Sequence, residues 1–136
     1  MNDVTPTEVV PQGLASLASR FLDVAAMPWY EPFPGMRMKV LYKDDAAKEA
    51  TILFETQVGA IIPEHVHGGV EWAFILEGTM EDAEGICTAG NFVLRPAGSR
   101  HEVHTPYGAK YIAFFHGSAR SVATGRLFPE YGEQDG

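Results

Sequence analysis

The sequence has a single cysteine, Cys87, so a disulfide within one chain is excluded. Because Cys87 lies in a β-forming segment, we interpret it as a small apolar strand residue rather than a reactive thiol. We also expect no secretion signal, because Asp3 and Pro6 stand where such a signal would have basic residues and an apolar run. We therefore expect a cytoplasmic protein.

Basic residues and long apolar runs are scarce as well. Ten Lys and Arg face eighteen Asp and Glu, which gives a formal net charge of -8, and the basic residues form no cluster. The phosphate backbone of a nucleic acid would repel such a chain. No apolar stretch approaches the roughly 18 residues that a membrane-spanning helix requires. We expect neither a nucleic acid nor a membrane as a partner.

Convincing long helices are absent too. Fourteen glycines and nine prolines in 136 residues divide the chain into short segments rich in Val, Ile, Phe, Tyr and Thr, a pattern typical of an all-β sandwich or barrel. The length suits one domain. The predicted strands are Arg20–Val24, Met36–Tyr42, Ala50–Val58, Ile61–His67, Val70–Glu77, Gly78–Asp82, Gly85–Thr88, Asn91–Arg95, Glu102–Thr105 and Lys110–His116.

Histidines are few but grouped, and they carry the chemical signal. His65 and His67 are two residues apart, so on a strand both side chains point to one face, and Glu71 follows four residues later. His101 and His104 form a second group. A single buried histidine is usually structural, but several imidazoles beside a carboxylate would need many hydrogen-bond partners inside a barrel. A divalent metal would satisfy them together, and a site of imidazole and carboxylate without thiolate suits Fe, Mn, Ni, Co or Zn.

The spacing of these residues resembles the first cupin motif. Gly59, five residues, His65-x-His67, three residues, Glu71, six residues and Gly78 match every fixed position of that motif.

A second segment is similar to the second cupin motif. Gly90, five residues, Pro96-x-Gly98, two residues and His101 match it, and Thr105 stands where that motif often has Asn. The likeness spans about residues 36–116. It implies an all-β, single-domain, RmlC-like cupin fold, that is, a double-stranded β-helix or jelly-roll barrel. It also implies one divalent metal ion, with Fe(II) favoured, bound by His65, His67, Glu71 and His101.

A narrower resemblance is to cupins of the ChrR type, through Gly35–Tyr42 and Leu76–Asp82. In that group the barrel is half of a zinc-binding anti-sigma factor or stands alone. The helical domain and the His/Cys zinc ligands of the anti-sigma factors are not seen here, so that role is not expected. Free-standing relatives include non-heme iron dioxygenases that cleave β-diketones and aromatic ketones, often with three histidines as ligands.

We therefore expect a cytoplasmic Fe(II) dioxygenase that acts on dioxygen and a small diketone or aromatic ketone. The alternatives are an oxygen-independent isomerase or lyase, and a non-catalytic small-molecule sensor. We expect residues 1–35 to form an arm with an edge strand, residues 36–120 the barrel, and residues 121–136 a tail. A homodimer is expected, because a barrel edge needs covering and the strand Arg20–Val24 could cross to a partner.

Several side chains have open roles at this stage. His104 is the candidate catalytic residue, although it could equally orient a ligand, replace Glu71 or face solvent. Arg95 and Arg100 could receive an anionic substrate or form surface ion pairs. The acidic stretch from Glu77 to Glu84 is interpreted as exposed loop charge. Candidate pocket residues are Trp72, Phe74, Phe92, Tyr111, Phe114 and Phe115, with about half expected to point elsewhere because strand parity is uncertain by one position.

Overall fold

The computed structural model describes residues 17–132, and this part of the chain is all-β. A short 3₁₀ helix, η2 (Val24–Ala26), precedes the strands, and no α-helix occurs in the described residues. None of the helices in residues 17–132 is long and apolar enough to cross a membrane. The strands are β1 (Tyr30–Phe33), β2 (Met36–Asp44), β3 (Glu49–Thr56), β4 (Ala60–His67), β5 (Glu71–Asp82), β6 (Gly85–Thr88), β7 (Phe92–Arg95), β8 (Arg100–Thr105), β9 (Ala109–His116), β10 (Ala119–Ser121) and β11 (Leu127–Phe128).

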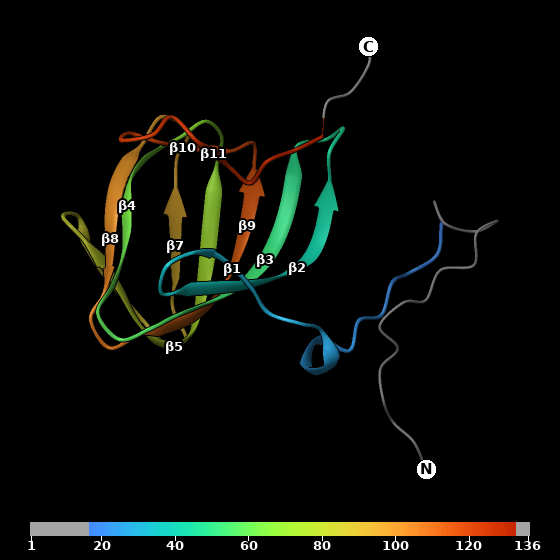
Figure 1. The fold of residues 1–136 in the computed structure, drawn as a ribbon, viewed down its shortest axis with the longest axis horizontal. Helices are drawn as coiled ribbons and strands as arrows, with labels where there is room; N and C mark the ends of the chain where they lie inside the picture. Colours follow the sequence, from blue (N-terminus) through green and yellow to red (C-terminus); the bar gives the residue numbers. More distant parts are fainter. Residues whose placement is uncertain (1–16, 133–136) are drawn as a thin grey trace.

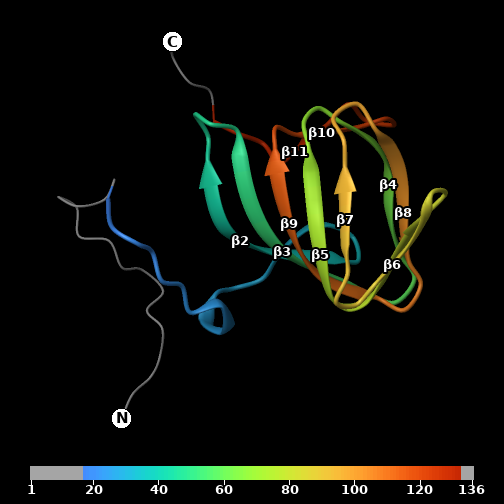
Figure 2. The ribbon, with the colours of Figure 1, turned by 180° about the vertical axis from the view of Figure 1, so that it is seen from behind.

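All strand pairs are antiparallel, and the sheet curls into a barrel (Figure 1). The strand order is β1-β2-β3-β9-β5-β8-β4-β10-β11, with β6 and β7 attached to β5. From behind, β2, β3, β9, β5 and β7 form one curved layer (Figure 2). The cupin-type barrel predicted from the sequence is confirmed.

The barrel bends at β5, which is one strand where the sequence predicts two. Its first half pairs with β9 and β7, and its second half with β6 and β8. The register with β9 shifts between Ile75 and Glu77, as at a β-bulge. Gly78 follows with a φ of 75°, and a Cβ there would lie 2.0 Å from the carbonyl oxygen of Gly108. Only glycine allows this bend, so the strand turns without ending.

Alternation along the strands defines the core. In β9, Tyr111, Ala113 and Phe115 are buried and their neighbours are more exposed. Phe54 of β3 stacks on Tyr111 with ring centroids 5.1 Å apart and meets Phe115 edge-on at 6.2 Å. Apolar side chains thus fill one part of the interior, and the histidine-bearing strands β4 and β8 close the other side.

The two ends of the chain differ from the sequence predictions. Arg20–Val24 is not a strand; it leads into η2, and the edge strand is β1, paired with β2. Residues 1–16 of the predicted arm lie outside the described residues. The predicted tail adds β11 to β10, and its Phe128 ring packs 5.5 Å from that of Phe33. Short segments rich in proline and glycine concealed these edge pairings.

Candidate metal centre

Three histidines come together where β4 and β8 pair. The antiparallel register places His65 opposite His101, and His67 lies on the same face as His65 because it is two residues further along β4. The ring centroids are 4.8 Å apart for His65 and His67, and 5.6 Å apart for His67 and His101. Histidines separated by more than thirty residues in the sequence thus form one cluster.

Two of these rings have a buried nitrogen with no partner. His67 and His101 are 3% and 5% exposed, and the Nε2 atom of each is buried without a hydrogen bond. A buried polar atom without a partner is unfavourable and calls for an explanation. For His65, Nδ1 lies 2.8 Å from the Pro63 carbonyl oxygen, which can only accept a hydrogen bond. Nδ1 of His65 therefore carries the proton, and its Nε2 has a free lone pair.

Burial keeps the three imidazoles neutral. Desolvation lowers the pKa of His67 to about 3, with smaller contributions from His65, His101 and Arg95. Desolvation likewise lowers the pKa of His65 and of His101. Neutral imidazole is the form that binds a metal ion.

Glu71 lies on the other side of His67. This first residue of β5 places its Oε1 atom 3.2 Å from Nδ1 of His67. Desolvation raises the pKa of the Glu71 carboxyl to about 7. The contact holds the His67 ring through Nδ1 and leaves Nε2 for another partner, which is how carboxylates orient metal-bound histidines.

A buried ion pair supports His101 in a similar way. Arg95 of β7 contacts the Asp82 carboxylate at the end of β5, and both side chains are at most 10% exposed. Nδ1 of His101 lies 3.4 Å from Asp82 Oδ2 and 3.3 Å from Arg95 Nη1. Because arginine can only donate, the Arg95 contact requires an unprotonated Nδ1 that accepts, whereas a protonated Nδ1 would instead donate to Asp82. The tautomer with Nδ1 protonated is the one that leaves the Nε2 lone pair of His101 free.

The acidic stretch predicted to be exposed therefore needs a correction at Asp82. Glu84 is 73% exposed as expected, but the Asp82 side chain is only 4% exposed. Arg100 forms the predicted surface ion pair, at 2.5 Å from Glu64. Asp82 ends a strand and turns inward, which charge composition alone does not reveal; its pairing with Arg95 across β5 and β7 depends on the fold.

The structure places His104 outside the histidine cluster, and the catalytic role predicted for it stays a prediction. Its side chain is 44% exposed, and Nε2 lies 2.9 Å from Glu102 Oε1 on the same strand. Parity explains this position: His101 points inward on β8, so the residue three positions later points outward. This position is the one expected of a polar surface residue, one of the alternatives that the sequence left open for His104.

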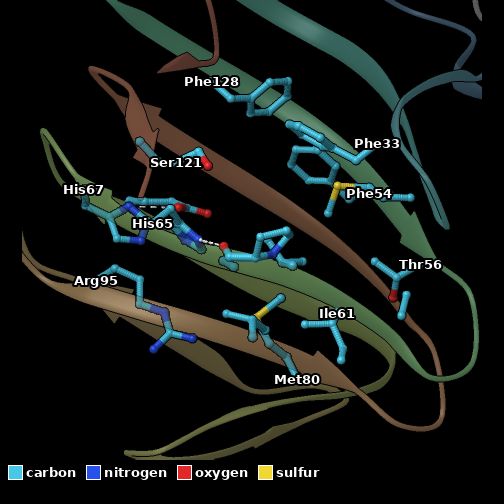
Figure 3. Close-up of a pocket in the computed structure, with 18 of the residues that line it drawn as sticks. Phe33, Phe54, Thr56, Ile61, His65, His67, Met80, Arg95, Ser121 and Phe128 are labelled. Atoms are coloured by element: carbon cyan, nitrogen blue, oxygen red, sulfur yellow. Dashed lines mark hydrogen bonds and ion pairs between the residues drawn. The ribbon is translucent and has the colours of Figure 1, made fainter. Parts of the chain in front are cut away.

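Two histidines of the cluster, His65 and His67, line a cavity of about 320 Å³ inside the barrel. Figure 3 shows His65, His67 and Arg95 at one side and Phe33, Phe54 and Ile61 toward the other. Further apolar side chains line it, among them Met36, Ile62, Met80, Val93, Val103, Phe115 and Phe128. Tyr111 and Phe115 are the predicted pocket residues that line it, whereas sequence reasoning missed Phe33 and Phe128, whose positions follow from the edge pairings.

The donor set fits a divalent metal ion. Within residues 17–132, no three His, Cys, Asp or Glu side chains are already set around a common point, so binding would require these side chains to move. The fit rests on the chemistry: two buried Nε2 atoms lack partners, and the Nδ1 atoms of all three rings lie beside groups that can accept a hydrogen bond. Three imidazole nitrogens beside an apolar cavity suit a metal that retains open positions for a ligand.

Comparisons with known proteins identify the family of the chain and its fold. Residues 18–120 match the family described as the ChrR Cupin-like domain. No curated protein sequence matches the chain significantly.

Several solved structures share the fold. A candidate acetylacetone dioxygenase from Methylibium petroleiphilum PM1 is 21% identical with a TM-score of 0.72, over 82% of this chain and 87% of that one. The acetylacetone dioxygenase of Acinetobacter johnsonii is 21% identical with a TM-score of 0.64, over 73% and 76%. The anti-sigma factor ChrR of Rhodobacter sphaeroides, solved in complex with SigE, is 18% identical with a TM-score of 0.61, over 83% and 70%. At these identities the likeness shows the fold.

Proposed function

Because this chain belongs to the ChrR cupin-like family, we propose that it is a metal-dependent dioxygenase acting on a small diketone or aromatic ketone. The observation that carries the proposal is the histidine cluster: buried, neutral imidazoles with unpartnered Nε2 atoms at the polar end of an apolar cavity. Similarity in fold to acetylacetone dioxygenases supports the substrate class. The assignment of an activity is ours, since a fold hosts many functions.

In this proposal His65, His67 and His101 hold one divalent ion, with Fe(II) favoured over Mn, Ni, Co or Zn. A bound Fe(II) would supply activation of dioxygen and of a chelating, enolised substrate. The chain orients the three ligands through the Pro63 carbonyl and the carboxylates of Glu71 and Asp82. Glu71, predicted as a fourth ligand, is proposed here to act through His67, because its Oε1 already lies beside Nδ1 of that ring.

The cavity favours a neutral, largely apolar substrate. Its wall away from the histidines is formed mainly by aromatic and aliphatic side chains, which would bind alkyl or aryl groups. Arg126 also lines the cavity, but its side chain is 48% exposed and lies 3.8 Å from Glu130. The buried cation on the wall, Arg95, already contacts Asp82, so it is not available to bind an anionic substrate without breaking that pair. A carbonyl compound placed with its oxygens toward the histidines and its hydrocarbon part toward Phe54 matches this polarity.

The test is oxygen uptake by protein reconstituted anaerobically with Fe(II), screened against acetylacetone and hydroxyacetophenones. We expect substrate-dependent uptake that His101→Ala abolishes, while His104→Ala, at the surface, retains it. No uptake by a sample whose metal content is confirmed would contradict the proposal. Anaerobic turnover would then indicate an isomerase or lyase, and saturable binding without turnover a sensor.

A further inference from the structure

One half of the curved layer seen in Figure 2 carries an exposed apolar surface that the metal centre does not use. On β5, β7 and β9 the residues that alternate with the inward-pointing ones face away from the cavity. We call this set the apolar outer face; it consists of Trp72, Phe74, Leu76, Phe92, Leu94, Ile112 and Phe114. Phe92 and Leu94 are 54% and 53% exposed, and Phe74 and Leu76 are each 40% exposed.

The register brings these side chains into one continuous surface. Trp72 lies opposite Leu94 on one side and Phe114 on the other, and Phe74 lies opposite Phe92 and Ile112. The rings of Trp72 and Phe114 stack with centroids 5.8 Å apart. An antiparallel sheet that faces water normally has polar residues at such positions. Four of the aromatics predicted to line the pocket thus form the outside of the barrel.

The other half of the same layer, at β2, carries basic side chains and is covered by another segment of the chain. Arg37 and Lys39 point outward from β2, and the ring of Trp29 lies 4.4 Å from the Arg37 guanidinium and 4.6 Å from Lys39 Nζ. Lys39 donates to the Val24 carbonyl at 2.7 Å and is 5% exposed. The segment from η2 to β1 therefore covers β2. Within the described residues, this segment leaves the large side chains of the apolar outer face exposed.

We propose that the apolar outer face binds the same face of a second copy of this chain, forming a two-fold dimer. The face itself has no charged residue, although the chain carries a net charge of -8. Two such acidic molecules repel each other overall, so an uncharged surface is where they can approach. In a two-fold dimer the same surface of both copies forms the interface. No free copy of that surface remains, so assembly stops at two chains.

The edges of the face also suit self-association. Lys110 and Glu77 lie 4.0 Å apart beyond one end, and His116 and Glu49 lie 3.7 Å apart beyond the other. Each edge therefore offers a nitrogen donor beside a carboxylate, so a second copy meets a complementary group in either orientation. A partner of strongly basic or acidic character would leave one of these groups unmatched.

The size of the face predicts the strength of the dimer. From the usual area of large side chains, the exposed part is on the order of 500 Å² per copy, or about 1,000 Å² for the pair. That value is at the lower limit of specific interfaces. We therefore expect a reversible dimer that dissociates at micromolar concentrations rather than a permanent one.

Sedimentation velocity over about 1 to 100 µM tests the dimer, because this range brackets micromolar dissociation. We expect the mass to rise from the 14.9 kDa of one chain toward twice that value. Leu94→Glu, and separately Phe92→Glu, should remain monomeric at the highest concentration. Both positions are more than half exposed, so the folded monomer tolerates the charge.

Ile86→Glu is the matched control. Ile86 is 68% exposed on β6, outside the apolar outer face, so this variant should dimerise like the unmodified protein. Near-ultraviolet circular dichroism shows whether each variant is folded. A chain that is monomeric throughout, a dimer that persists in both folded face variants, or equal loss in Ile86→Glu would each overturn the proposal.

Discussion

The tautomer of His101 depends on two oppositely charged neighbours at almost equal distance. Asp82 Oδ2 accepts from a protonated Nδ1, whereas Arg95 Nη1 would donate to an unprotonated one. Only the first arrangement frees Nε2 for a metal ion. Removing the carboxylate leaves Arg95 as the neighbour of Nδ1 and favours the tautomer that cannot coordinate. Of the two neighbours, only the buried carboxylate stabilises the form of His101 that can bind a metal through Nε2.

We predict that Asp82→Ala weakens binding of one divalent ion by about 10- to 100-fold, the usual effect of losing a group that orients a metal ligand. Isothermal titration calorimetry with Zn²⁺ measures the affinity, and ¹⁵N spectra of the imidazoles report the tautomer. Glu84→Gln is the control: its carboxylate lies 3.5 Å from Nδ1 but is 73% exposed, so affinity should hold. Unchanged affinity in Asp82→Ala would show that Asp82 does not set the tautomer.

Variants of Glu71 distinguish a metal site with three histidine ligands from a site with a fourth, carboxylate ligand. If Glu71 acts through His67, an amide oxygen can still accept from Nδ1, so we predict that Glu71→Gln keeps metal affinity within about threefold. Glu71→Ala removes the acceptor and should weaken binding more. Titration of both variants beside His101→Ala provides the comparison. Loss in Glu71→Gln as large as in His101→Ala would instead support direct coordination.

Part of the histidine site could be predicted from the sequence, and part could not. Period-two alternation places His65 and His67 on one face, and only the motif connects them with His101, because the β4–β8 pairing is a property of the barrel. Asp82 could not be singled out from its acidic neighbours, since whether a strand-end carboxylate turns inward depends on the bend of β5. The orientation of Trp72 and Phe74 likewise depends on one position of register.

At the scale of elements, β5 depends on glycine at its bend. The sequence indicates a break at Gly78, and the structure shows a close backbone approach rather than a chain reversal. A Cβ at Gly78 would meet the Gly108 carbonyl oxygen at 2.0 Å, and the φ of 75° adds strain for any other residue. Gly90 has a similar φ of 83°, yet a Cβ there meets nothing within 4 Å. Comparing variants of the two glycines therefore separates the cost of a steric clash, present only at Gly78, from the cost of a left-handed backbone, present at both.

We predict that Gly78→Ala lowers the free energy of unfolding by about 3 kcal/mol or more, because the clash requires backbone movement. Gly90→Ala should cost only about 1 kcal/mol, the usual strain of a left-handed residue. Urea denaturation followed by Trp fluorescence measures both. Equal losses in the two variants would mean that the sheet relaxes around Gly78 and that β5 does not require the close approach.

At the scale of the whole molecule, the layer that forms one wall of the cavity also carries the apolar outer face. The side chains of β5 and β9 alternate between the two surfaces, so Tyr111 and Phe115 line the cavity while Ile112 and Phe114 face outward. In the proposed dimer, net charge and apolar contact act in opposite directions. With a charge of -8 on each copy, repulsion opposes the dimer while the apolar contact favours it.

Added salt should therefore strengthen self-association rather than weaken it. Raising NaCl from about 50 to 500 mM shortens the screening length from more than 10 Å to less than 5 Å, which reduces repulsion between the copies and leaves apolar burial intact. We predict a several-fold lower dissociation constant by sedimentation equilibrium, with Ile86→Glu following the same trend. A dimer that weakens with salt would indicate that ion pairs such as those near Lys110 hold it together, with the apolar outer face contributing little.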